Sequence, residues 1–314
     1  MEAEKRQNWT TATEITLVGF PVNTHQQMVL FGLFLVIYLL TIMSNLLIIT
    51  VVSSERRLHS PMYIFLCNFS FLEIWYTSVT VPKMLVGLMS GNHAISKAGC
   101  IVQYYFFFVF GAMENVLLAV MAYDRFVALC HPLRYTVLMS GVICVRLILF
   151  SWIVSFLAPV MPAIWISKLL FCGLNHLDHF FCDFWPLLQL SCMDTWLAEL
   201  TFLIIAWTVL LVCFFFVLSS YGFIIFTIRQ TPSSTGKSKA ISTCTAHLTV
   251  VGIYYSTSLY TYVRLRGAGR FQNDKIVSVF YAVATPLLNP VIYSLRNRDM
   301  KESLHRFLRK YRGH

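Results

Sequence analysis

Charged side chains are scarce in this 314-residue chain. Asp, Glu, Lys and Arg make up 12% of it, whereas hydrophobic residues make up 57%, and the mean hydropathy is +0.67. A soluble globular domain carries about 25% charged residues. The apolar residues form long blocks separated by short polar ones, a pattern typical of a polytopic membrane protein. The shortage of charge therefore excludes an ordinary soluble domain.

Acidic residues are scarcer than basic ones, with 14 Asp and Glu against 24 Lys and Arg, so the net charge is +10. A basic chain can bind nucleic acid, but here the basic residues are not gathered on one soluble face, and we expect no nucleic-acid partner. The first 16 residues also lack an apolar stretch and contain three glutamates. Without a signal peptide, the first span is expected to act as its own insertion signal.

Seven apolar blocks are long enough to cross a bilayer. We predict an all-α membrane protein, a seven-transmembrane helix bundle, with spans at 28–52, 61–86, 101–120, 142–165, 196–228, 240–263 and 274–295. With the N-terminus outside, the inner loops and tail hold 15 of the 24 Lys and Arg residues, as the positive-inside rule requires. The predicted regions are therefore an extracellular tail (1–27), a seven-span domain (28–295) and a cytoplasmic segment (296–314).

The cytoplasmic segment has the pattern of a short amphipathic helix on the inner leaflet. A soluble interaction helix is the alternative, but the position directly after a span favours the membrane surface. No cysteine follows Cys244, which excludes palmitoylation of this tail. The apolar residues that recur at helical spacing between Arg and Lys are Met300, Leu304, Phe307, Leu308 and Tyr311.

Two carboxylates, Glu73 and Glu114, lie deep in predicted spans, as do the amides of Asn45 and Asn289. Ionisable groups at that depth are candidate functional residues. Two carboxylates facing one cavity repel, so one would hold a proton unless a cation lay between them. We favour a bound cation over a neutral, hydrogen-bonded pair, because burying two charges is costly.

An acid and a base, Asp124 and Arg125, lie side by side at the inner end of the third span. They could simply anchor the span in the interface. Alternatively, they could form a latch, in which Asp124 holds Arg125 until a conformational change frees it for an intracellular partner. The surrounding string, 121–135, decides between these interpretations, and five further strings support it: 44–45, 58–66, 220–221, 239–248 and 286–297. Together they resemble olfactory (odorant) receptors of the tetrapod type, a branch of the rhodopsin-like G-protein-coupled receptors, and this resemblance favours the latch.

The resemblance implies an odorant-activated receptor rather than an enzyme. A small volatile ligand would bind in an outer cavity between the third, fifth and sixth spans and activate a stimulatory G protein, which raises cyclic AMP. The protein would lie in the plasma membrane of sensory cilia. Aromatic stripes at helical spacing are more often packing than pocket, but an outward-opening cavity between helices favours ligand binding here. The expected cavity residues are Tyr104, Phe107, Phe108, Gly111, Ala112, Ile205, Val209, Tyr255, Ser258, Leu259 and Tyr262.

The outer half of the third span carries no acid, and we place Glu73 and Glu114 below the cavity. An amine ligand is therefore disfavoured, and an alcohol, aldehyde, ketone or ester is expected. Arg264 and Arg266 near the outer mouth leave a carboxylic acid open. The resemblance further implies coupling or switch roles for Asp124, Arg125, Tyr221, Lys239, His247, Asn289, Pro290 and Tyr293, and a sodium site at Asn45, Glu73, Glu114 and Asn289.

Four of the nine cysteines, Cys100, Cys172, Cys182 and Cys192, fall on the oxidising outer side. Spacing alone leaves three pairings open. The resemblance implies Cys100–Cys182 and Cys172–Cys192. The histidines and carboxylates of the same loop could bind zinc or copper, but a cysteine in a disulfide offers no thiolate, so we favour an ordinary disulfide loop. Asn8 begins an N-glycosylation sequon.

Two other classes of function fit the residues less well. A transporter or channel would show an inverted repeat, paired broken helices or a file of polar groups across the membrane, and none is visible in the sequence. An intramembrane enzyme would need a nucleophile and a base beside Glu73 or Glu114. No such pair accompanies them.

Overall fold

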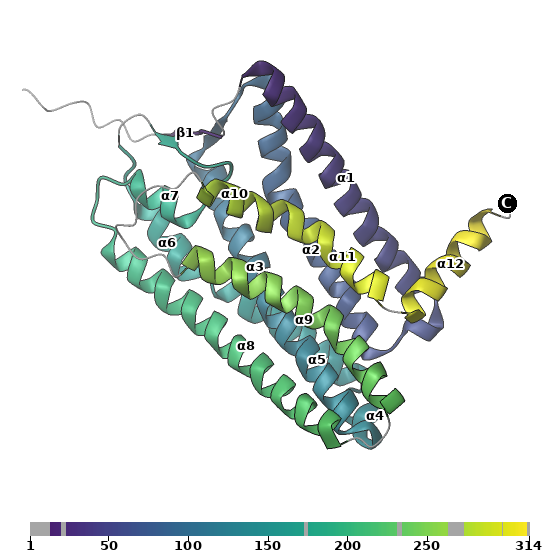
Figure 1. Ribbon diagram of the computed structural model, residues 1–314. Coiled ribbons are helices and arrows are strands. Elements are labelled where there is room, and N and C mark those ends of the chain that lie inside the picture. Colours follow the sequence, from purple (N-terminus) through teal and green to yellow (C-terminus); the bar gives the residue numbers. More distant parts are fainter. Residues whose placement is uncertain are drawn as a thin grey trace, which may run out of the picture.

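The computed structural model describes residues 13–19, 23–172, 175–230, 234–262, 273–296 and 298–312. Long helices lie side by side in a bundle, and the outer loops gather at one end of it (Figure 1). The first three spans are α1 (Thr24–Ser54), α2 (Pro61–Ser90) and α3 (Lys97–Cys130). The fourth consists of α5 (Gly141–Leu157) and α6 (Val160–Lys168), the fifth is α8 (Trp196–Gln230) and the sixth is α9 (Ser234–Tyr262). The seventh joins α10 (Asn273–Val279), a π-helical turn (Phe280–Ala284) and α11 (Thr285–Arg296).

The predicted seven-helix bundle is confirmed. In the described part of the chain, six spans are long and apolar enough to cross a membrane by length and composition alone. The remaining one, α9, is rich in Ser, Thr and Tyr, and it lies alongside α3 and α8 within the bundle (Figure 1). Large apolar side chains such as Val29, Leu33 and Val36 are exposed on α1. In a membrane protein these side chains face lipid, where they carry no cost.

Local signals fix where several helices begin and end. Asn23 caps α1: its side chain accepts the N–H of Gln26 at 2.9 Å, while the Gln26 side chain accepts the N–H of Asn23 at 3.1 Å. Such reciprocal caps satisfy otherwise unpaired backbone donors. Pro61 opens α2, where its missing N–H is not needed. Gly91 ends α2 with a φ of +67°, a conformation that favours glycine.

The fourth span is not the single helix expected over 142–165. The chain leaves the helix at Ala158 and Pro159 and re-enters it at Val160. Proline lacks a backbone N–H and its ring clashes with the preceding turn, so it breaks a helix at this point. The break divides the span into an inner segment, α5, that packs against α3, and an outer segment, α6, that packs against α8.

A small sheet at the outer end adds to the helical architecture, and the sequence patterns did not predict it. Strand β1 (Glu14–Leu17) is central, with β2 (Ala94–Ser96) antiparallel on one side and β3 (His176–Leu177) parallel on the other. Ile15 and Leu17 are buried in an outer hydrophobic cluster that is separate from the main core of the bundle. The predicted extracellular tail therefore includes an ordered strand that packs on the loops.

Short elements and a final helix complete the fold. The connections contain 3-10 turns at Arg56–Leu58 and Pro132–Arg134 and the helices α4 (Tyr135–Leu138) and α7 (Phe184–Gln189). The last helix, α12 (Arg298–Arg312), is amphipathic as predicted: Met300 is buried and Leu304 and Phe307 are half-buried, whereas Lys301 and Arg306 are exposed. The side chains of Leu308 and Tyr311 lie outside the described residues.

Candidate functional site

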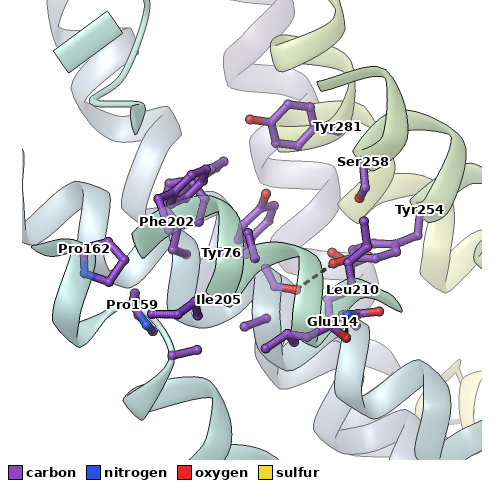
Figure 2. A pocket seen from close by; sticks show the side chains of 18 of the residues that line it. Tyr76, Glu114, Pro159, Pro162, Phe202, Ile205, Leu210, Tyr254, Ser258 and Tyr281 are labelled. Atoms are coloured by element: carbon purple, nitrogen blue, oxygen red, sulfur yellow. Dashed lines mark hydrogen bonds between the residues drawn. The ribbon is translucent and has the colours of Figure 1, made fainter. Parts of the chain in front are cut away.

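A cavity lies in the outer half of the bundle, walled by α3, α6, α8 and α9 and reached by residues of the second and seventh spans (Figure 2). It offers about 90 Å³ to the centres of water-sized molecules. One water needs about 10–15 Å³ by this measure. The cavity therefore has room for a small organic molecule.

Most of the residues expected at the cavity line it. Five of them come from α3, because positions three or four apart on a helix share one face. The expected residues that line the cavity are Tyr104, Phe107, Phe108, Gly111, Ala112, Ile205, Val209 and Ser258.

Two expected residues do not line the cavity. The hydroxyl of Tyr255 donates to Asn115 Oδ1 at 2.7 Å, so its side chain lies behind the wall, between α9 and α3. Leu259 is 39% exposed on the outside of α9. The helix turns by about 100° per residue, so the cavity face of α9 runs through Tyr254, Thr257 and Ser258 instead. The side chain of Tyr262 lies outside the described residues.

Sequence reasoning missed the contributions of three other spans. Tyr76 of the second span and Tyr281 and Thr285 of the seventh reach the cavity, and the broken fourth span adds Pro159 and Pro162. The two prolines were the available signal, since a proline-broken helix within a bundle exposes backbone to a neighbouring space. Phe202, Ala206 and Leu210 continue the face of α8 that Ile205 and Val209 indicated.

Aromatic rings build the outer wall. Phe184 of the outer loop stacks on Phe202 with ring centroids 3.7 Å apart, and Phe202 meets Phe108 edge-on at 5.2 Å. Phe107 contacts Phe181 of the same loop at 4.6 Å and stacks on Tyr76 at 5.1 Å. Offset and edge-to-face pairs each add about 0.5–1.5 kcal/mol beyond area burial. The loop that closes the cavity is thus packed directly onto it.

Both predicted disulfides are formed. Cys100 and Cys182 have Cα atoms 5.4 Å apart, and Cys172 and Cys192 have theirs 5.7 Å apart. The N–H of Cys182 donates to Gln103 Oε1 at 3.0 Å, which adds a second tie to α3. The described residues bring together no group of three or more His, Cys, Asp or Glu side chains that could hold a metal ion, the outer loop included.

The outer loop is also tied to the seventh span. Lys275 donates to the carbonyl oxygen of Gly19 at 3.1 Å and to that of Val18 at 3.4 Å, and it forms an ion pair with Asp178. One ammonium group therefore joins the tail, the loop and α10. Because Asp178 is 54% exposed, this ion pair contributes little by itself. The structural role of Lys275 is to hold the tail, the outer loop and α10 next to one another.

Two buried titratable groups lie in this loop. Burial lowers the pKa of His179 to about 4, and nearby Lys275 acts in the same direction. Burial raises the pKa of Asp183 to about 6, although the N–H of Phe184, which donates to Asp183 Oδ1 at 2.8 Å, acts against this. At neutral pH the histidine is therefore uncharged.

The floor of the cavity is polar and lies deeper than expected. The hydroxyl of Tyr254 donates to the carbonyl oxygen of Gly111 at 3.0 Å, and Asn115 Nδ2 donates to that of Val209 at 3.1 Å. Glu114 also lines the cavity. The prediction that Glu114 lies below the cavity is therefore wrong, because the cavity extends past the break at Pro159 to this turn of α3.

The four residues of the expected sodium site are all buried. Asn289 Nδ2 donates to Glu73 Oε1, and Asn45 Nδ2 donates to the carbonyl oxygens of Thr41 at 2.9 Å and Pro286 at 3.3 Å. Three oxygens have no hydrogen-bond partner among the described residues: Asn45 Oδ1, Glu114 Oε1 and Asn289 Oδ1. Such oxygens are the ligands that hard cations take, so these residues fit a bound cation.

At the inner end, Asp124 does not pair directly with Arg125. The described residues contain no ion pair within 4.0 Å between them, and Asp124 Oδ1 instead accepts the hydroxyl of Tyr135 at 2.8 Å. Consecutive residues of a helix do not face each other, which is why the expected pair is absent. Burial and the adjoining Asp124 raise the pKa of Tyr135, so its hydroxyl keeps the proton that it donates.

A second inner contact joins three helices. The hydroxyl of Tyr221 (α8) lies 2.8 Å from His247 Nδ1 (α9), and His247 Nε2 lies 3.1 Å from the carbonyl oxygen of Leu118 (α3). A carbonyl only accepts, so Nε2 carries the proton and Nδ1 accepts from Tyr221. Arg125 is buried about two turns beyond Leu118 on α3. This contact therefore holds α8 and α9 against α3 beside the arginine.

The other predicted switch residues lie nearby or outside the described residues. Tyr293 is buried with its ring 5.9 Å from that of Phe69, and its hydroxyl has no partner among the described residues. Pro290 lies inside α11, directly after Asn289. The side chain of Lys239 and the glycosylation candidate Asn8 lie outside the described residues.

A heptahelical bundle with a cavity in its outer half and the sequence Asp124-Arg125 at the inner end of its third span defines the architecture of a membrane receptor. The family model described as "Olfactory receptor" matches residues 34–311. The chain is 50% identical over 307 residues to Olfactory receptor 11L1 of Homo sapiens, covering 98% of this chain and 95% of that protein. It is 49% identical over 298 residues to Olfactory receptor 6B1 of Homo sapiens (95% and 95%) and 46% identical over 300 residues to Olfactory receptor 6B9 of Mus musculus (96% and 95%).

The chain therefore belongs to the olfactory receptor family. Members of this family are odorant-sensing G-protein-coupled receptors and multi-pass proteins of the plasma membrane, and they are not enzymes.

Proposed function

We propose that an odorant in the outer cavity activates a stimulatory G protein and so raises cyclic AMP. The observation that carries this proposal is that α9 is hydrogen-bonded to α3 at two levels, once at the cavity and once at the inner end. On this helix Tyr254 bonds to α3 at the cavity, and His247 bonds to α3 at the inner end. The two residues are seven apart, about two helical turns. A ligand that displaces Tyr254 therefore acts on the same rigid helix that holds the inner end closed.

The mechanism is a shift between two populations. In the closed arrangement Tyr221, His247 and the Leu118 carbonyl hold α8 and α9 against α3, and Arg125 is buried beside them. Ligand binding favours an arrangement in which the inner half of α9 swings outward. Arg125 then becomes accessible to the G protein, with Tyr221 free to hold the opened arrangement.

Odorant-evoked cyclic AMP tests this proposal. The receptor is expressed in cells that lack stimulatory G-protein α subunits, and in the same cells after an olfactory-type stimulatory subunit is restored. The proposal expects a response to an active odorant only after restoration. Equal calcium or ion-flux responses without the subunit, or no cyclic AMP with it, would contradict the coupling.

We also propose that a sodium ion binds among Asn45, Glu73, Glu114 and Asn289. Three unpaired buried oxygens and two carboxylates in one polar layer support a monovalent cation there. Its charge would offset the repulsion between the two carboxylates. The melting temperature of the purified receptor should rise with sodium but not with the bulky cation N-methylglucamine at equal ionic strength. Glu73→Gln should abolish that difference, and a difference unchanged in this variant would contradict the site.

A further inference from the structure

The cavity has two chemically different ends. Pro159, Pro162, Ile205 and Phe202 lie on one side, and Glu114, Tyr254 and Ser258 lie on the other (Figure 2). The first group offers only apolar surface, while the second offers hydroxyl and carboxyl groups. An occupant that matches both ends has an apolar body and a polar head. The orientation of such an occupant is fixed, with the head toward α3 and α9.

The polar groups at this end are not equally available. Both polar atoms of the Asn115 amide already have a hydrogen-bond partner: Nδ2 donates to the Val209 carbonyl oxygen, and Oδ1 accepts from the hydroxyl of Tyr255. The hydroxyl of Tyr254 donates to the Gly111 carbonyl. Glu114, in contrast, is only 5% exposed, and its Oε1 has no hydrogen-bond partner among the described residues. Glu114 Oε1 is thus a fully buried acceptor that these contacts leave unpaired.

An unpaired buried carboxyl oxygen is costly, because the group has lost its water without gaining a partner. A ligand that supplies a donor removes that cost, whereas one that supplies only an acceptor does not. A carboxylate has about four acceptor positions, so a cation held on the side of Glu73 and Asn289 leaves capacity toward the cavity. Discrimination by such a site is strong, because a ligand without the donor leaves the acceptor buried and unpaired.

We propose that Glu114 is a specificity-determining residue of the odorant cavity, which accepts a hydrogen bond from the hydroxyl or amino head group of a small amphipathic odorant. This inference rests on the assignment of the cavity to odorant binding. It names the class of ligand: compact molecules with an apolar body and one hydrogen-bond donor. It also replaces the sequence-based expectation that amines are disfavoured, because that expectation assumed no acid at the cavity.

The test uses isomer pairs that differ only in whether the oxygen carries a hydrogen. Hexanol is compared with methyl pentyl ether, and benzyl alcohol with anisole, and hexylamine is added as the amino probe. The first readout is the shift in melting temperature of the purified receptor with each probe, which does not depend on any G protein. The second is cyclic AMP in transfected cells. The proposal expects the alcohols or the amine to be preferred over the ethers by about tenfold or more in apparent affinity.

Glu114→Gln is the decisive variant, because it keeps the shape of the side chain while replacing one carboxyl oxygen with an amide NH2 group. The preference for the alcohol should fall about tenfold, since the side chain loses acceptor positions and gains a donor that an ether oxygen can accept. Glu199→Gln is the matched control: it makes the same change on a wall helix, α8, but Glu199 does not line the cavity and instead accepts from the hydroxyl of Thr195. It should leave the preference unchanged.

Four results would overturn the proposal: ethers that stabilise the receptor as well as alcohols, no stabilisation by any alcohol or amine, a preference unchanged in Glu114→Gln, or an equal loss in Glu199→Gln. The last would mean that the effect does not arise from the carboxyl group at the cavity. A melting-temperature preference without any cyclic AMP response would instead contradict the proposed G-protein coupling and leave the role of Glu114 supported.

Discussion

The outer and inner ends of this receptor are held together by different kinds of interaction. At the outer end two disulfides, a three-stranded sheet and the Lys275 contacts join the tail, the outer loops and the third and seventh spans. At the inner end the described contacts between spans include two neutral hydrogen bonds through His247, and Asp124 is bonded to the adjoining loop. The two ends of one bundle are therefore unequal in strength.

The magnitudes show which end can open. A disulfide contributes about 2–5 kcal/mol and does not break thermally. A single hydrogen bond contributes about 0.5–1.5 kcal/mol net. A small ligand can supply a few kcal/mol of differential binding, which is enough to change the inner contacts but not the outer ones. The ligand is thus enclosed at an end that stays fixed, and the response appears at the end that is weakly held.

Removing the Cys100–Cys182 disulfide, which tethers the long outer loop to α3, should have the largest effect. Cys100→Ser or Cys182→Ser frees a loop of 82 residues and should abolish surface expression, because the loop no longer closes the cavity. Cys172→Ser frees a loop of only 20 residues and should cost about 1 kcal/mol less by loop entropy. Cys213→Ser, at a buried free thiol, is the control for cysteine loss. Surface immunostaining measures the outcome, and wild-type levels in Cys100→Ser would contradict the role of the tether.

Replacing Arg125, the buried arginine of the inner end, should abolish signalling without affecting the outer end. Arg125→Ala should reach the surface and bind odorant but fail to raise cyclic AMP. Lys should rescue poorly, because an ammonium lacks the planar fork of the guanidinium. Arg146→Ala removes an exposed arginine at the inner end of α5 and should signal normally. Odorant-evoked cyclic AMP is measured at matched surface level, and full signalling from Arg125→Ala would leave this residue as a membrane anchor.

Weakening the inner end should raise activity in the absence of odorant. Tyr135→Phe removes the hydroxyl that donates to Asp124 and leaves a buried carboxylate without that donor. A hydrogen bond to a charged group contributes about 1.5–3 kcal/mol, so the basal cyclic AMP level should rise about tenfold if the bond exists only in the closed arrangement. Tyr123→Phe, one residue before Asp124, is the matched control. A basal level that is unchanged, or lowered, in Tyr135→Phe would show that this bond does not favour the closed state.

The smallest effect concerns pH and the outer end. The pKa of His179 is lowered from 6.5 to about 4, so its protonation opposes folding, and stability is lost as the pH falls from 6.5 toward 4, by up to about 3 kcal/mol. The pKa of Asp183 is raised from 3.8 to about 6, so its ionisation opposes folding, and stability is gained as the pH falls from 6 toward 3.8, by a similar amount.

These two effects oppose each other, so the wild-type melting temperature should change little across this range. His179→Gln should reveal the Asp183 effect and melt higher as the pH falls from 6 to 4. Asp183→Asn should reveal the His179 effect and melt lower over the same interval. Melting temperatures of the purified variants against pH decide this, and parallel profiles in both would show that the two groups are not buried in solution.

The sequence predicted the features that depend on periodicity and composition. The spans and the cavity face of α3 follow from where apolar residues recur, and the disulfide pairing followed from the family resemblance. Strand β1 was missed because Glu14–Leu17 is too short for its alternation to indicate a strand, and its partners lie about 80 and 160 residues further along the chain. Two features could not be predicted: which face of α9 lines the cavity, and that Glu114 lines it. Both depend on how the helices are rotated about their axes and where they are broken, and tertiary packing determines this.

The most direct test measures both ends of the same receptor. Spin labels at Val137 of α4 and at Ile241 near the inner end of α9, both exposed, report one distance, and labels at Met89 and Met193, exposed at the outer end, report the other. Each distance is measured without ligand and with an active odorant plus nucleotide-free G protein. The account predicts that the inner distance lengthens by several ångström while the outer one stays the same. An outer distance that changes as much as the inner one, or an inner distance that does not change, would contradict it.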